Sequence, residues 1–409
     1  MYQLTYNQLL TDLHQAYYDA RRHKGSKPYV KRFERRLEAN LIALCDELYE
    51  RRYEPLPSTC FVISDPKKRE VFAANFRDRI VHHLYYNYTH EMYERTFIQD
   101  SYSCIRGRGT HYGVRRLERH IRQSSRNYSR PCYVLKLDVR GYFMHICRER
   151  LLELCLHTLH QMATHRILKR VPALWQDKID ISFVEYLTRE IVLLNPAEGC
   201  RIAGCESDWD DLPHDKSLFH SPEGCGLPIG NLTSQLFSNV YLNALDQYMK
   251  RELGCRHYGR YVDDFYVVGC DRNWLLGLVP KINSWLSENM RLALHDGKVT
   301  LTDIRQGVEF LGVNVLPYRS EVGAACKKRI KLKLHGLERW ARQNRGVLSA
   351  TRIAERLRAS LDSFCGVLSH GRNYHNRVKL ITGRAVFLQY GNFDREVRHF
   401  CCQTRYVQF

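Results

Sequence analysis

The sequence has no long uninterrupted apolar run, and this absence limits the classes of protein it can encode. No hydrophobic stretch reaches the roughly 20 residues that a membrane-spanning helix needs. The first 22 residues, MYQLTYNQLLTDLHQAYYDARR, also lack the basic-then-apolar order of a secretion signal. They instead place Leu4, Leu9, Leu10, Leu13 and Tyr17 at helical spacing, which predicts an amphipathic helix. We therefore expect a cytoplasmic protein without a membrane partner.

Internal repeats, low-complexity tracts and flexible linkers are missing too, so we expect one continuous enzyme domain with several lobes. The 15 cysteines are an odd number scattered through predicted helices and strands, which favours reduced core residues. Cys200, Cys205 and Cys225, with His214 and His220 between them, have the composition of a zinc site. Their spacing is irregular, whereas structural zinc sites usually contain close cysteine pairs. The sequence leaves open whether these cysteines bind a metal, and we do not predict it.

Negative charge is scarce, with 44 acidic residues against 63 basic ones and a net charge of +19. Such an excess favours a polyanionic partner, and nucleic acid leads because no membrane anchor is visible. The basic residues gather in four clusters, at residues 21–36, 65–83, 106–123 and 327–345. Any one cluster could be a solvated helix face. Four of them around one acidic centre predict a groove that follows a phosphate backbone.

The acidic centre is the pair Asp263 and Asp264, in the apolar and aromatic stretch RYVDDFYVVG. This pattern predicts a β-hairpin whose tight turn carries both aspartates. A third carboxylate, Asp138, ends a predicted strand in YVLKLDVRGYF. An isolated Asp-Asp pair is usually an ordinary turn, but buried carboxylates are costly unless a cation neutralises them. The three aspartates therefore predict two Mg²⁺ ions about 3.5–4 Å apart, the arrangement that catalyses nucleotidyl transfer.

In order along the chain, the motifs resemble those of reverse transcriptases. The motifs are DPKKREVFAANFRDRIVHH, DSYSCIRGRGTH, LKLDVRGYF, GLPIGNLTSQLFSNVYLN, YVDD, LHDGKVTL and GVEFLGVNV. The resemblance covers residues 53–315 and continues more weakly beyond them. It implies an α/β (α+β) right-hand polymerase fold with fingers, a palm of antiparallel sheet plus helices, and a helical thumb. The expected parts are an N-terminal helical region with fingers (1–130), a palm (131–318) with an insertion at about 151–225, and a thumb with a C-terminal RNA-binding region (319–409).

The resemblance also implies a role for each matching residue. Asp138, Asp263 and Asp264, with the backbone of Val139, would hold two Mg²⁺ ions, for which Mn²⁺ can substitute. Lys298 matches the lysine that would protonate the leaving pyrophosphate, although a surface lysine is an equal alternative. Phe143 matches a steric gate against ribonucleotides. The residues implied to contact the incoming dNTP are Lys67, Arg69, Tyr142, Phe143, Ile229 and Gly230. The residues implied to contact nucleic acid are Arg77, Arg79, Arg106, Arg108, Gln235, Tyr261, Lys327, Lys328 and Arg329.

The chain departs from most reverse transcriptases at Ile229. Most members of that family carry glutamine at this position, immediately before the glycine that is Gly230 here. An isoleucine can only pack, whereas an amide can hydrogen-bond near the nucleotide. The segment IGNLTSQ (residues 229–235) resembles two bacterial groups, the diversity-generating retroelement enzymes and the unclassified defence-associated reverse transcriptases. The chain ends about one thumb's length after the last palm motif, so we expect no endonuclease or RNase H domain.

We therefore expect a bacterial RNA-directed DNA polymerase that copies a dedicated RNA encoded nearby, in phage defence or in diversity generation. Its partners would be template RNA, nascent DNA and dNTPs, with an accessory protein or a second copy of the chain left open. The alternatives are an RNA polymerase on the same palm, a template-independent or protein-primed DNA polymerase, and a non-catalytic RNA-binding scaffold. Phe143 and the YVDD turn argue against an RNA product, and the three aspartates argue against a scaffold.

Overall fold

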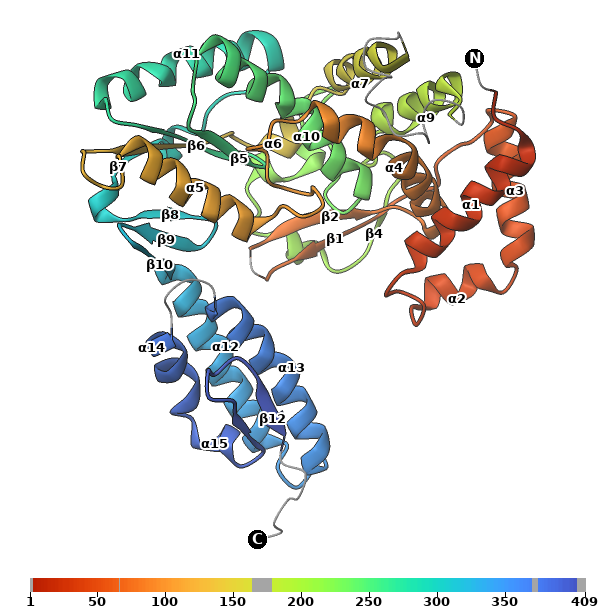
Figure 1. The fold of residues 1–409 in the computed structure, drawn as a ribbon. Helices are drawn as coiled ribbons and strands as arrows, with labels where there is room; N and C mark the ends of the chain where they lie inside the picture. The colour runs from red at the N-terminus through yellow and green to blue at the C-terminus, as the bar shows by residue number, and fades with distance from the viewer. Residues whose placement is uncertain (1–2, 66, 164–178, 370–373, 403–409) are drawn as a thin grey trace. The chain divides into compact units, whose positions relative to one another are not determined.

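The computed structural model describes residues 3–65, 67–163, 179–369 and 374–402, which form mixed helices and sheets (Figure 1). The chain divides into two compact units. The first comprises Met1–Gly109, Lys136–Tyr266 and Leu276–Val299, and the second comprises Thr110–Leu135, Val267–Leu275 and Thr300–Phe409. The predicted boundaries of fingers, palm and thumb stay a prediction. Within the described ranges, no helix is long and apolar enough to cross a membrane.

Four helices begin the first unit. They are α1 (Tyr6–Arg21), α2 (Pro28–Glu34), α3 (Leu37–Tyr49) and α4 (Phe76–Thr96). The Thr5 hydroxyl caps α1 by accepting from the Gln8 backbone N–H at 3.3 Å. Leu9, Leu13 and Tyr17 lie on the buried face of α1, which packs against α3 and α4. The predicted amphipathic helix is therefore confirmed.

A small sheet follows, in which β1 (Thr59–Ile63) pairs antiparallel with β2 (Arg69–Ala73) and parallel with β4 (Arg201–Ile202). The predicted insertion is helical first, in α7 (Arg148–Ala163) and α9 (Ile181–Leu193). Beyond β4 it contains only short 3₁₀ turns, which agrees with the loop-like second half that the sequence predicts. These turns are η2 (Glu206–Trp209), η3 (His214–Lys216) and η4 (Leu218–His220).

A second, four-stranded sheet is antiparallel and has the order β5-β6-β3-β7. Its strands are β3 (Tyr133–Asp138), β5 (Tyr258–Tyr261), β6 (Asp264–Gly269) and β7 (Thr300–Asp303). The helical elements around it in the sequence are α6 (Tyr142–His145), α10 (Leu232–Gln247), the π turn η5 (Tyr248–Glu252), α11 (Arg272–Met290) and η6 (Asp296–Lys298). The predicted strand ending at Asp138 and the predicted hairpin at the aspartate pair are both confirmed.

The second unit begins with α5 (Thr110–Ser124) and contains the antiparallel sheet β10-β9-β8. The strands are β8 (Val308–Phe310), β9 (Val313–Leu316) and β10 (Arg319–Val322), preceded by the short turn η7 (Ile304–Gln306). Its C-terminal elements are α12 (Ala324–Gln343), α13 (Ala350–Leu368), α14 (Tyr374–Arg377), η8 (Val378–Thr382), α15 (Ala385–Leu388), β11 (Gly391–Phe393) and β12 (Phe400–Cys402).

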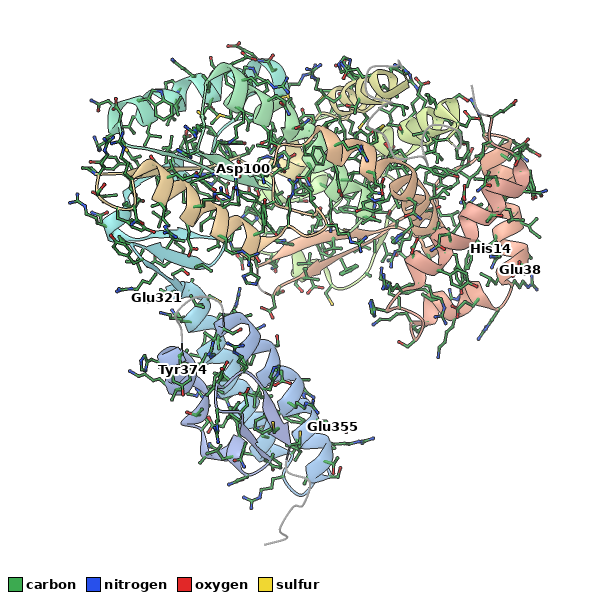
Figure 2. All side chains as sticks on the ribbon, viewed as in Figure 1. His14, Glu38, Asp100, Glu321, Glu355 and Tyr374 are labelled. Carbon is green, nitrogen blue, oxygen red and sulfur yellow. The ribbon has the colours of Figure 1, made fainter. Side chains whose placement is uncertain are left out.

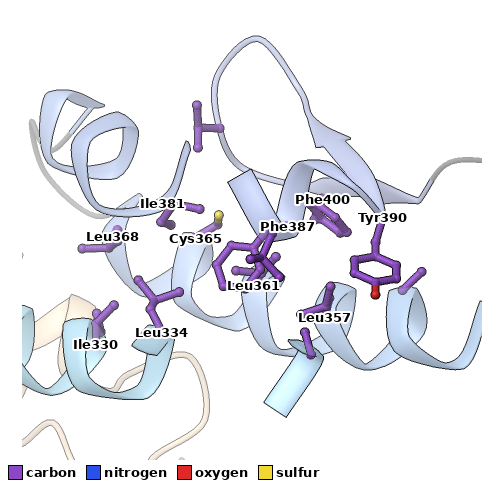
Figure 3. Close-up of a cluster of buried hydrophobic side chains, with 14 of the residues drawn as sticks. Ile330, Leu334, Leu357, Leu361, Cys365, Leu368, Ile381, Phe387, Tyr390 and Phe400 are labelled. Atoms are coloured by element: carbon purple, nitrogen blue, oxygen red, sulfur yellow. The ribbon is translucent and has the colours of Figure 1, made fainter. Parts of the chain in front are cut away.

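The helical end of the chain has a core of its own (Figure 3). Ile330 and Leu334 of α12 belong to one buried cluster with Leu361 and Leu368 of α13, and Phe387 of α15 is fully buried in the same cluster. These positions recur at helical spacing, and burying them stabilises the packing of α12 on α13. The expected helical thumb is therefore present as a packed helical segment.

Candidate active site

The three predicted aspartates lie at the ends of neighbouring strands. Asp138 is the last residue of β3, Asp264 is the first residue of β6, and Asp263 lies in the turn between β5 and β6. Because β3 and β6 are adjacent in the sheet, all three carboxylates reach the same region of the first compact unit. The three aspartates therefore lie near one another, and their role as metal ligands stays a prediction.

The three carboxylates repel one another electrostatically. Burial raises the pKa of Asp263 to about 6, and the nearby charge of Asp138 adds to the increase. Burial likewise raises the pKa of Asp264 to about 6; Lys136 opposes this, whereas Asp138 and Asp263 reinforce it. The site is therefore short of positive charge, which is the condition under which carboxylates bind cations.

Lys298 supplies part of the missing positive charge. Its Nζ donates to Asp138 Oδ1 at 2.7 Å, and its side chain is half exposed. The backbone fixes this approach, because His295 N–H donates to the Asp138 carbonyl at 2.8 Å and Lys298 N–H donates to the His295 carbonyl at 2.9 Å. The structure brings Lys298 to the aspartates as the sequence predicts, and its role as proton donor stays a prediction.

The turn that carries the aspartate pair is strained. Val262 has φ 56°, in the left-handed region that a β-branched residue rarely occupies. Two side chains hold it there: Ser103 Oγ accepts from Val262 N–H at 3.3 Å, and Arg260 Nη1 donates to the Val262 carbonyl at 3.0 Å. Such strain persists only where the surroundings enforce it, and here it aims Asp263 and Asp264 into the site.

Arg260 forms a buried ion pair that sequence patterns did not reveal. Its side chain and that of Asp246 are both 0% exposed, and Arg260 Nη2 lies 2.6 Å from Asp246 Oδ2. Arg260 Nε and the Tyr258 hydroxyl both donate to Asp246 Oδ1, at 2.8 and 2.6 Å. The pair ties β5 to α10, and Arg260 also contacts the turn that carries the aspartates through the Val262 carbonyl. The only clue in the sequence is an arginine inside an apolar strand.

The segment after α4 covers the edge of β5. Tyr102 N–H donates to the Arg260 carbonyl at 2.9 Å, and Arg260 N–H donates to the Asp100 carbonyl at 2.8 Å. The Asp100 side chain, labelled in Figure 2, pairs with Lys250 at 3.2 Å. The DSYSC motif thus acts as an extra strand-like partner of the catalytic hairpin.

The residues predicted to contact the nucleotide have different surroundings. Tyr142 is buried and its hydroxyl donates to the Ser238 carbonyl at 2.6 Å, so its visible contact is structural. Phe143 is half-buried and packs edge-on against Tyr142. Both substrate roles stay predictions.

Ile229 and Gly230 lie against β2. The Ile229 carbonyl accepts from Phe72 N–H at 2.9 Å, and its side chain packs against the cluster that contains Cys60, Phe72 and Met144. Gly230 has φ 128°, and a Cβ there would lie 2.9 Å from the Phe72 carbonyl oxygen. The observed reason for this glycine is therefore a close approach to β2.

The cations predicted to reach the triphosphate lie at the β1–β2 hairpin, where Lys67 and Arg69 are exposed. Arg69 is near enough to Asp263 to lower its pKa, against the larger effect of burial. Between them and the core, the buried Glu70 accepts from Trp209 Nε1 at 2.7 Å, Ser217 Oγ at 2.9 Å and Leu218 N–H at 2.6 Å. Glu70 thus ties the hairpin to the insertion, a contact across more than a hundred residues that the sequence did not indicate.

Three of the predicted nucleic-acid-binding arginines have partners within the protein. Arg77 pairs with Glu47 and Asp78, and Arg79 Nε donates to the Ala74 carbonyl at 2.8 Å. Arg108 Nη1 donates to the carbonyls of Ile98 and Ser101, at 2.8 and 2.9 Å. These contacts account for much of the hydrogen-bonding capacity of the three guanidiniums, and their role in nucleic acid binding stays a prediction.

The other predicted nucleic-acid contacts are more accessible. Arg106 and Gln235 are exposed and Tyr261 is half-buried. In the second unit, Lys328 and Arg329 are exposed on α12, whereas Lys327 lies 3.5 Å from Glu321. Nothing in the structure tests these roles.

Among the residues that the structure describes, no group of three or more His, Cys, Asp or Glu side chains is placed to hold a metal ion. For Cys200, Cys205 and Cys225 this gives no support to a zinc site. Eight of the fifteen cysteines are buried as free thiols, as the sequence predicts for core residues. The same holds for the three aspartates. Their carboxylates lie near one another, with Lys298 bound to Asp138, but they are not arranged as the ligands of one metal ion.

Residues 65–315 match the family model described as reverse transcriptase (RNA-dependent DNA polymerase). The match spans more than half of the chain, so the chain belongs to this family and is an RNA-directed DNA polymerase, a nucleotidyltransferase. The predicted right-hand polymerase fold and enzyme class are thereby confirmed.

The chain is also similar to protein YkfC of Escherichia coli (strain K12), with 24% identity over 322 residues, which cover 70% of this chain and 74% of YkfC. Solved structures similar to it include telomerase from Candida albicans in complex with a TWJ fragment of telomeric RNA (12% identity, TM-score 0.43, 83% of this chain) and apo telomerase from Candida tropicalis (12% identity, TM-score 0.45, 81% of this chain). The matched region spans 60% of each of those chains.

Proposed function

We propose that this protein copies a dedicated bacterial RNA into DNA by nucleotidyl transfer with two divalent metal ions. The observation that carries the proposal is the meeting of Asp138, Asp263 and Asp264, whose burial and mutual repulsion leave the site short of positive charge. A pure RNA-binding scaffold gains nothing from such a costly arrangement.

The donor set fits Mg²⁺, because carboxylate and carbonyl oxygens are its preferred protein ligands. Asp138, Asp263, Asp264 and the Val139 carbonyl would hold the ions, and Mn²⁺ would substitute. When bound, the ions supply activation of the attacking hydroxyl and stabilisation of the leaving pyrophosphate. Since Lys298 Nζ donates to Asp138 in this structure, Asp138 exchanges that contact when it takes part in metal binding.

The chain's own residues complete the site. Lys67 and Arg69 bind the triphosphate, and the electrostatic reach of Arg69 to Asp263 supports this placement. Phe143 excludes a 2′-hydroxyl by its bulk. Lys298, half exposed and beside Asp138, delivers a proton to the departing pyrophosphate.

Two biological roles are compatible with these residues, antiphage defence and diversity generation. The side chain of Ile229 is partly buried and packs against the cluster with Cys60 and Phe72, so packing is one reason for an isoleucine at this position. This contact favours neither role over the other.

The decisive experiment is to purify the protein with the RNA encoded on either side of its gene, add Mg²⁺ and all four dNTPs, and sequence the product. A copy of a repeat-bearing RNA, faithful or mutated at adenines, supports diversity generation. A short repetitive DNA made from a structured RNA supports defence. DNA synthesis that persists after the RNA is removed would instead support the template-independent alternative.

Asp263→Asn is the matched catalytic variant. It removes one negative charge from the carboxylate group, so we expect DNA synthesis to fall below detection while RNA affinity changes by less than about twofold. In the presence of a chelator, its melting temperature should equal or exceed that of the unaltered protein, because a buried repulsive charge is gone. Unchanged DNA synthesis would contradict the metal assignment.

A further inference from the structure

Helix α5 presents a row of arginines that the catalytic site does not use. Arg115, Arg119 and Arg122 are exposed and recur at four- and three-residue steps, whereas Val114, Leu117 and Ile121 on the other face are buried. In the part of the chain that the structure describes, none of the three arginines has an ion-pair partner. The row extends over about 10 Å of helix, so it can contact successive phosphates of one strand.

Two tyrosines lie beside this row. Tyr128 follows α5, Tyr318 lies at the tip of the β9–β10 hairpin, and their rings are 4.5 Å apart between centroids. The Tyr318 hydroxyl donates to the Asn127 carbonyl at 3.3 Å, yet the residue remains 66% exposed. The ring is thus held in place with much of its surface in water.

The backbone holds both tyrosines in a left-handed conformation. Tyr318 has φ 62° and Tyr128 has φ 68°, in the left-handed region that bulky side chains rarely occupy. Ser125 Oγ accepts from Tyr128 N–H at 2.8 Å and so helps to hold the second of them. Tyr318 lies in the two-residue turn between β9 and β10, where a left-handed residue is an ordinary turn conformation, and this turn fixes the position of its ring.

The arginines and tyrosines line one pocket of about 930 Å³ within the second compact unit. Glu118 adds a carboxylate to the lining, between Arg115 and Arg119. The volume suits a ligand of nucleotide size. The pocket therefore combines cations for phosphate, an aromatic surface for a base and an acceptor for a hydroxyl or amino group.

We propose that this α5 pocket binds a single-stranded segment of RNA, separately from the catalytic aspartates. The guanidiniums of Arg115, Arg119 and Arg122 pair with successive phosphates, and an unpaired base stacks on the exposed ring of Tyr318. Glu118 accepts from the 2′-hydroxyl of a ribose, which favours RNA over DNA. The inference rests on the proposed function, in that the RNA partner of the polymerase is the ligand.

The test uses the full-length protein and a fluorescent single-stranded RNA of mixed sequence, with binding measured by anisotropy over a range of salt concentrations. Changing Arg115, Arg119 and Arg122 together to Gln should reduce the slope of log K against log salt by about 2, because about three phosphate contacts are lost. Tyr318→Ala should weaken binding roughly 5- to 150-fold, the range for losing one stacked base.

Two control variants separate a specific effect of the pocket from the effects of lower net charge and of a lost tyrosine hydroxyl. Changing Arg251, Arg272 and Lys281 together to Gln removes the same charge at exposed positions that do not line the pocket, and should leave most of the slope. Tyr318→Phe keeps the ring and removes the hydroxyl, so binding should stay within about twofold. An Arg triple variant that behaves like its charge-matched control, or Tyr318→Ala with unchanged affinity, would overturn the proposal.

Extension of a DNA primer on a homopolymeric RNA template reports on the catalytic site independently. The pocket variants should retain this activity at saturating template. If the unaltered protein makes no DNA, and the pocket variants bind RNA more weakly than it does, the polymerase proposal fails and the pocket proposal stands. If it makes DNA and the pocket variants bind RNA normally, the pocket proposal fails alone.

Discussion

At the scale of the residue, the active site is built from groups held in costly states. Val262 occupies a left-handed conformation, and the two aspartates after it are partly buried near a third carboxylate. Each of these features lowers the stability of the free protein. If these carboxylates hold the proposed metal ions, stability is lost here in exchange for activity.

Phe143 gives a prediction about sugar selection. Phe143→Ala removes the half-buried ring that is expected to lie under the sugar, so ribonucleotides should enter more readily. We expect the ratio of kcat/KM for rNTP over dNTP to rise by about tenfold to a hundredfold. The measurement is single-nucleotide extension on a fixed primer, with Phe143→Tyr as the control that keeps the bulk. An unchanged ratio would remove the gate role.

His82 gives a prediction about pH. It is buried beneath α10, where its Nδ1 lies 2.9 Å from Thr233 Oγ1, and burial, aided by the charges of His83 and Arg79, lowers its pKa to about 4. The unfolded chain takes up this proton near pH 6.5, so stability is lost as pH falls from about 6.5 to about 4, by up to about 3 kcal/mol.

His82→Gln cannot take up that proton, so its free energy of unfolding should depend less on pH across the same window. Urea unfolding of both proteins at several pH values measures the difference, in which contributions from other groups cancel. Parallel pH profiles would show that His82 does not contribute.

At the scale of the element, the β5–β6 hairpin depends on the pair Arg260–Asp246. Arg260→Met alone leaves Asp246 buried and unpaired, and should lower the free energy of unfolding by about 3–5 kcal/mol. The double variant with Asp246→Leu should recover much of that loss, because both charges are then absent. Chemical unfolding of the four proteins of this cycle gives the coupling energy; additive losses would contradict a direct pair.

The elements also show what the sequence could predict. The strand ending at Asp138 and the hairpin at Asp263 are local patterns of apolar residues and turns, so they were predictable. Glu70 and its partners Trp209 and Ser217 are far apart in sequence, and no local pattern reports such a contact. The intramolecular partners of Arg77 and Arg108 were likewise not predictable, because the sequence shows the charge of an arginine and not the carboxylates and carbonyls that the fold brings to it.

At the scale of the whole molecule, the net charge of +19 governs encounter with RNA. If about six phosphates are contacted, affinity for single-stranded RNA should fall by about two to three orders of magnitude between roughly 50 and 200 mM salt. A binding series at several salt concentrations measures this slope. A nearly flat series would mean that the basic clusters face water and take no part in binding.

The contact between Lys298 and Asp138 has a consequence for how the enzyme can be handled. If the proposed metal ions bind the aspartates, the ammonium of Lys298 supplies part of their positive charge when they are absent, so chelation leaves the carboxylates partly neutralised. Preparations stripped of divalent ions should therefore survive storage and regain activity when Mg²⁺ returns. In a variant without Lys298, survival of the folded protein during storage should depend on the presence of divalent ions.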